Sequence, residues 1–89
     1  MSGRLELIRG LLVKAFSPSE IEVVDESHKH IGHAGARDGR GHFAVRIRSA
    51  SFSGKAPLAR HRAVYEALGD LMQTDIHALS IKALAPDEV

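Results

Sequence analysis

Hydrophobic residues recur every three or four positions along the first part of the chain, from Ser2 onward; they are Leu5, Ile8, Leu12 and Phe16, with Leu11 and Ala15 beside them. This spacing predicts a helix. The helix should end at Ser17-Pro18, because proline disfavours the α conformation in the residue before it. Beyond it, Ile21 and Val23 alternate with glutamates, which predicts a short strand from Glu20 to about Asp25.

The second half of the chain shows the same two periods in the order strand, helix, strand. Apolar Phe43, Val45 and Ile47 alternate with Ala44, Arg46 and Arg48, which predicts a half-buried strand with a basic outer face. Pro57 suits the first turn of a helix, and an apolar stripe extends this helix to about Met72; its members are Leu58, His61, Tyr65, Leu68 and Met72. The last strand should span Ile76 to Ala83, with His77 on the same face as Leu79 and Ile81.

The predicted order is therefore α-β-β-α-β, an α+β fold in a single domain covering residues 1–89, with 84–89 as a tail. The first two strands should form an antiparallel hairpin. A right-handed crossover should then bring the third strand in parallel to the second. Both helices would cover one face of a mixed three-stranded sheet, a two-layer sandwich. The expected core residues are Phe43, Val45, Ile47, Leu68, Leu79 and Ile81.

The stretch from Ser27 to His42, SHKHIGHAGARDGRGH, has neither a helical nor an alternating period, so we expect a long loop. Loops of this length are usually functional or disordered. It contains four of the six histidines, and a glycine-rich backbone can fold closely around an ion. The loop therefore suits metal coordination, although a solvated loop whose histidines do little is the alternative.

Composition restricts the chemistry of this chain. It has no cysteine, which excludes a disulfide framework, a cysteine nucleophile and any cysteine-ligated metal site made by this chain alone. Its net charge is only +1, yet residues 27–62 hold eight basic residues against Asp38 alone. Such a positive region attracts phosphate backbones or an acidic partner, unless it is simply a solvated face. No secretory signal or membrane-length apolar segment is evident, so we expect a cytoplasmic protein without membrane contact.

Several blocks of the sequence resemble the BolA family, and together they cover nearly the whole chain; they are Asp25 to His30 with Gly32-His33, His42 to Val45, Phe52 to Lys55, Arg60-His61-Arg62, and Ile76 to Ile81. The resemblance implies a class II KH-like fold and association with a monothiol glutaredoxin. It further implies a [2Fe–2S] cluster shared with that partner and glutathione, and none in the isolated chain. Its ligands would be His77 and a loop histidine, for which His30 matches the family position and His33 is a close competitor.

From the residues alone, His77 also fits a partly buried histidine bonded to the backbone. We expect His42 and His61 to be structural, and His28 to be one residue too early for a ligand. Cluster ligation through imidazoles should be labile at acid pH, since each ring must be neutral to bind.

Two other functions remain open. Some members of the family act in transcriptional control and stress responses, and the fold suggests nucleic-acid binding through Lys55, Arg60 and Arg62 at the start of the second helix. The Ser53-Gly54-Lys55-Ala56 turn is only a degenerate form of the GXXG loop of KH domains, so we expect weak, salt-sensitive binding. Alternatively, the loop histidines could hold zinc or nickel autonomously. We expect a monomer and no enzymatic activity, since no catalytic set of residues is legible.

Overall fold

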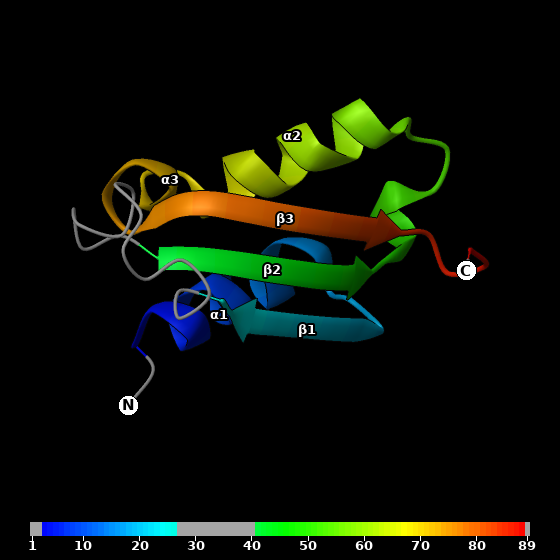
Figure 1. Cartoon of the computed structure of the whole chain (residues 1–89). Coiled ribbons are helices and arrows are strands. Elements are labelled where there is room, and N and C mark those ends of the chain that lie inside the picture. Colours follow the sequence, from blue (N-terminus) through cyan, green and yellow to red (C-terminus); the bar gives the residue numbers. More distant parts are fainter. Residues whose placement is uncertain (1–2, 27–40, 89) are drawn as a thin grey trace.

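A computed structural model of the chain describes residues 3–26 and 41–88. Three strands form one sheet in the order β1-β2-β3, in which β2 pairs antiparallel with β1 and parallel with β3 (Figure 1). This arrangement confirms the predicted α+β fold with a mixed sheet. The elements are α1 (Gly3–Phe16), β1 (Glu20–Asp25), β2 (Gly41–Arg48), the 3-10 turn η3 (Ala50–Phe52), α2 (Pro57–Leu68), α3 (Leu71–Thr74) and β3 (Ile76–Leu84).

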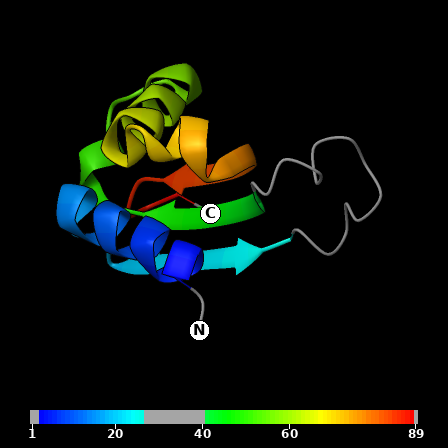
Figure 2. The same cartoon turned by 90° about the vertical axis from the view of Figure 1, so that its left-hand side faces the viewer.

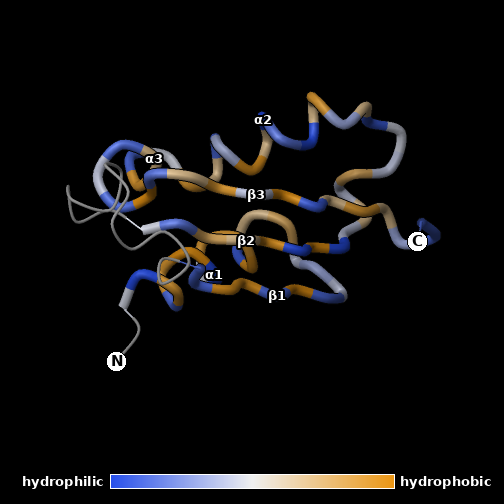
Figure 3. The backbone as a smooth tube through the Cα atoms, viewed as in Figure 1, coloured by the Kyte–Doolittle hydropathy of each residue, from blue (hydrophilic) through white to orange (hydrophobic). Residues whose placement is uncertain are grey.

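Alternation along the strands decides which face of the sheet is covered. The register pairs Ile21 with Ile47 and Val23 with Val45, so apolar side chains of β1 and β2 share one face. Helices α1 and α2 lie against that face (Figure 2), and the strand segments alternate in hydropathy as this arrangement requires (Figure 3). Within residues 3–26 and 41–88, no helix covers the other face.

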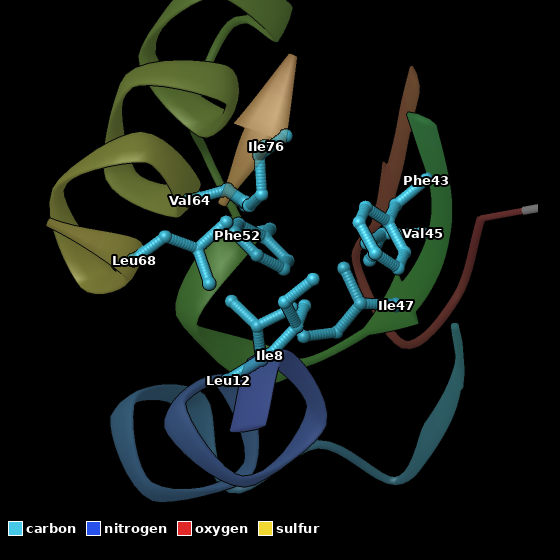
Figure 4. Close-up of a cluster of buried hydrophobic side chains, with 9 residues drawn as sticks. All are labelled: Ile8, Leu12, Phe43, Val45, Ile47, Phe52, Val64, Leu68 and Ile76. Atoms are coloured by element: carbon cyan, nitrogen blue, oxygen red, sulfur yellow. The ribbon is translucent and has the colours of Figure 1, made fainter. Parts of the chain in front are cut away.

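The core lies between the helices and the covered face of the sheet (Figure 4). Its buried side chains are Ile8, Leu12, Phe43, Val45, Ile47, Phe52, Val64, Leu68 and Ile76. Leu79 and Ile81, which we expected in the core, are half-buried at its margin. Phe52 was expected only as part of a turn; η3 instead carries its ring inward, where it is fully buried against Phe16 with 4.9 Å between ring centroids.

The helix expected from Pro57 to Met72 is interrupted, so that prediction is wrong over its last turn. Gly69 takes a positive φ of 56° and ends α2, while its N–H still donates to the Tyr65 carbonyl oxygen. A glycine adopts such a conformation at little cost. The short helix α3 follows and delivers the chain to β3.

None of the helices in the described part of the chain is both long enough and apolar enough to span a membrane.

Candidate functional site

His77 is the extra residue of a β-bulge at the start of β3. Gly41 pairs with Ile76 and His42 pairs with Ala78, so His77 has no partner in the register. Bulges re-aim side chains locally, and here Ile76 is 1% exposed while the His77 side chain is exposed. The expectation that His77 faces the apolar side with Leu79 and Ile81 is therefore wrong, because the bulge breaks the simple alternation on which it depended.

A second imidazole lies beside His77. The ring of His42, at the start of β2, is centred 5.1 Å from the His77 ring at an interplanar angle of 56°. His42 is half-buried and its Nε2 atom is buried. Parallel pairing places the first residues of β2 and β3 at the same end of the sheet. Once the topology is known, His42 and His77 are therefore expected to be neighbours. The expectation that His42 is structural did not include this neighbour, because the pair forms only through the pairing of β2 with β3.

Residues 27–40 connect to the described structure at this same end of the sheet. The N–H of Glu26 donates to the His42 carbonyl oxygen at 2.7 Å, and the N–H of Gly41 donates to the Asp75 carbonyl oxygen at 2.9 Å. Both attachment points therefore lie next to the two histidines. His28, His30 and His33 themselves lie outside the described residues, so a pairing of His30 or His33 with His77 stays a prediction.

The carboxylate of Asp75 stands two residues before His77. Its Oδ1 accepts a hydrogen bond from the Thr74 hydroxyl at 2.6 Å, and its Oδ2 accepts one from Arg4 Nε at 3.1 Å. These two donors, Thr74 first, hold the pKa of Asp75 below its ordinary value. The carboxylate charge two residues before His77 is thus held in place by Thr74 and paired with Arg4. Among residues 3–26 and 41–88, no group of three or more His, Cys, Asp or Glu side chains is arranged to hold a metal ion, so a metal bound here needs further ligands.

The turn before α2 and the first half of α2, which contain the predicted nucleic-acid residues, lie toward the C-terminal end of β3 (Figure 1). Lys55 and Arg62 have exposed side chains. Arg60 does not: its side chain is 11% exposed and forms an ion pair with Glu88. The structure therefore presents Lys55 and Arg62 to solvent and holds Arg60 against the C-terminal segment, an arrangement that the sequence did not reveal.

Comparison with known proteins gives a consistent result. A family model described as "BolA-like protein" matches residues 12–88. The chain is 41% identical over 76 residues to the DNA-binding transcriptional regulator BolA of Escherichia coli, covering 85% of this chain and 70% of that protein. It is 46% identical over 87 residues to SufE-like protein 1, chloroplastic/mitochondrial, of Arabidopsis thaliana. That match covers 92% of this chain but only 24% of the Arabidopsis protein.

Among solved structures, the BolA domain of SufE1 from Arabidopsis thaliana matches with a TM-score of 0.88 and 43% identity. The match covers 100% of this chain and 99% of that one. The fold described above, with its three helices and mixed sheet, is therefore the fold of solved BolA domains.

Proposed function

Because this chain belongs to the BolA-like protein family, we propose that it shares a [2Fe–2S] cluster with a monothiol glutaredoxin and acts in cluster trafficking or iron-linked regulation. The observation that supports this proposal is the exposed imidazole of His77, beside His42, at the end of the sheet where residues 27–40 attach. In this role the protein is a binding partner and not an enzyme.

The residues of this chain that could bind iron fit a cluster shared with a partner better than a cluster held by this chain alone. With no cysteine in the sequence, every thiolate must come from the glutaredoxin or from glutathione. Histidines can replace cysteines on one iron of a [2Fe–2S] centre, which raises its reduction potential. His77 would provide one ligand and His30 or His33 the other. The bulge turns His77 outward, where a partner-held cluster can reach it, while Ile76 anchors the same strand in the core.

The test is a comparison of the His77→Ala variant with the wild type, each mixed with a monothiol glutaredoxin, glutathione, iron and sulfide. We expect the wild type to form a one-to-one complex with its own visible circular dichroism and with nitrogen couplings in the electron paramagnetic resonance of the reduced state. His77→Ala should lose both signatures. His61→Ala is a matched control, since it removes a half-buried imidazole from α2. Unchanged nitrogen couplings in His77→Ala would contradict the ligand assignment.

Loop ligation is tested separately. His30→Ala should do less harm than His77→Ala, because His33 lies three residues away and can substitute. Combining His30→Ala with His33→Ala should then cost more than the sum of the single changes, the sign of two residues that replace one another. Additive losses would show that only one of them, or neither, binds.

Nucleic-acid binding is a second candidate function, supported by the similarity to the E. coli regulator and by the exposed basic side chains of Lys55 and Arg62. Binding should weaken as salt is added, and the slope of log affinity against log salt concentration measures how many phosphates the protein neutralises. Replacing both residues by alanine should reduce the size of this slope by about 0.7–0.9 for each phosphate that the protein no longer neutralises. Lys14→Ala, in the exposed last turn of α1, is the control. An unchanged slope would move the phosphate-binding surface elsewhere, and absence of binding at low salt would end this candidate.

The cytoplasmic location and the monomeric state stay predictions. One of the relatives is named as a chloroplastic/mitochondrial protein, so fractionation of cells and light scattering of the purified chain are the direct measurements.

A further inference from the structure

The C-terminal segment after β3 places a carboxylate on Arg60. Glu88 Oε1 and Oε2 accept hydrogen bonds from the two terminal nitrogens of Arg60, at 2.5 and 2.9 Å, and the N–H of Ala85 donates to Oε1 at 2.9 Å. Three donors thus converge on the two oxygens of one anion. A bidentate guanidinium contact of this kind is among the strongest hydrogen-bonding arrangements for carboxylates and phosphates alike.

The guanidinium is positioned independently of the carboxylate. Arg60 Nε donates to the Lys55 carbonyl oxygen at 2.8 Å, and a terminal nitrogen donates to the Ala83 carbonyl oxygen at 2.9 Å. These two backbone contacts tie Arg60 to the turn before α2 and to β3. These two contacts would therefore keep the guanidinium in place if Glu88 moved away. Such an arrangement is a preorganised receptor for an oxyanion.

The backbone of the segment has its own anchor. A terminal nitrogen of Arg48 donates to the carbonyl oxygens of Ala85 at 3.1 Å, Pro86 at 3.3 Å and Glu88. The Glu88 side chain, in contrast, remains 40% exposed. The carboxylate can therefore exchange with a solvent-borne anion through a rotation of one side chain, while Arg48 keeps the Ala85 amide in position.

The donors strongly favour a charged occupant. The pKa of Glu88 falls from 4.5 to about 2, first because of the hydrogen bonds from Arg60 and then because of the Ala85 N–H. A phosphodiester resembles this occupant closely, since it carries one negative charge and presents two non-bridging oxygens. Lys55, whose carbonyl oxygen accepts a hydrogen bond from Arg60 Nε, adds an exposed positive charge in the turn beside the site.

We propose that Arg60 and the Ala85 amide form an oxyanion site for a backbone phosphate of a nucleic acid, and that Glu88 occupies this site as an internal competitor. The inference rests on the second of the two proposed functions. It adds that the C-terminal segment weakens nucleic-acid binding, and that displacement of Glu88 strengthens it.

The experiment compares Glu88→Ala with Asp87→Ala in the full chain, using a short single-stranded DNA as the probe. Both variants lose one negative charge from adjacent positions, but only Glu88→Ala vacates the three donors. We expect Glu88→Ala to bind the DNA more tightly than Asp87→Ala. The slope of its log affinity against log salt concentration should also be steeper by about 0.7, the value for one additional bound phosphate. Adding Arg60→Gln to Glu88→Ala should abolish the gain. Equal binding by the two single variants, or a gain that survives Arg60→Gln, would overturn the proposal.

A nuclear magnetic resonance titration with inorganic phosphate locates the anion. In Glu88→Ala, phosphate should shift the Ala85 amide and the Arg60 Nε–H resonances, whereas Asp87→Ala should show no such response. Absence of these shifts overturns the site, and shifts without a gain in DNA affinity overturn its assignment to nucleic acid. If the wild type binds DNA through Lys55 and Arg62 but Glu88→Ala binds it no more tightly, nucleic-acid binding is retained as a function and the proposed competition by Glu88 is wrong. If no variant binds DNA, both fail.

Discussion

Adding the same methyl group at two glycines should change stability in opposite directions. Gly69, which ends α2, has φ 56° and ψ −128°, a region that side chains disfavour. A Cβ there meets nothing closer than the Glu66 carbonyl oxygen at 4.0 Å, so backbone strain alone decides the cost. Strain of this kind costs about 1–3 kcal/mol, partly offset by a less flexible unfolded chain, about 0.4–1 kcal/mol. Gly69→Ala should therefore lose about 1–2 kcal/mol.

Gly10 provides the matched opposite case. It lies inside α1, and a Cβ at this position has nothing within 4 Å. Alanine is favoured over glycine in a helix interior by about 0.5–1 kcal/mol, so Gly10→Ala should stabilise the protein by that amount.

Urea denaturation followed by far-ultraviolet circular dichroism measures both effects. The midpoint should fall for Gly69→Ala and rise for Gly10→Ala, with the dependence of unfolding free energy on urea unchanged. Midpoints that move in the same direction would refute the conformation assigned to Gly69 or the helix assigned around Gly10.

Three further predictions concern the core, a buried hydroxyl and the C-terminal carboxylate. Phe52→Ala should cost about 3–5 kcal/mol in chemical denaturation, whereas Leu58→Ala, at a side chain 63% exposed, should stay within about 0.5 kcal/mol. Ser49→Ala should cost about 1–3 kcal/mol, because the Ser49 hydroxyl donates to the Phe16 carbonyl oxygen at 2.7 Å and accepts from the Ser51 N–H; Ser51→Ala, at an exposed side chain, is the control. The lowered pKa of Glu88 means that its contribution to stability is present above about pH 4.5 and is lost as pH falls toward about 2. The difference in denaturation midpoint between wild type and Glu88→Gln should accordingly shrink over that window, and a difference that persists at pH 2 would contradict the assigned ion pair.

The periodicity of the sequence predicted the strands well because their alternation is simple. Glu20–Asp25 was placed correctly, and the second and third strands were each short by one or two residues. The departures come from backbone features that periodicity does not encode. A positive φ at Gly69 divides one apolar stripe into two helices, and η3 turns Phe52 inward from a segment that contains Ser and Gly.

The candidate site, too, could be predicted from the sequence only in part. His77 was identified through a family resemblance, yet its direction was predicted wrongly because a bulge cannot be read from alternating residues. His42 joins His77 only through the pairing of two strands that lie far apart in the sequence. Likewise, nothing local to Arg60 indicates that Glu88 will bind it, since that ion pair depends on how the chain turns after β3.

The bulge at His77 has a consequence for how this protein can change during evolution or design. Ile76 is buried in the core and its neighbour His77 is exposed. The register of β3 against β2, with its shift between Gly41 and His42, sets both positions. Deleting one residue between Asp75 and Leu79 would remove the irregularity and move either the anchor out of the core or the imidazole off the surface. The register therefore constrains the length of this segment, so engineers who wish to retune this end of the molecule should substitute residues and not delete them.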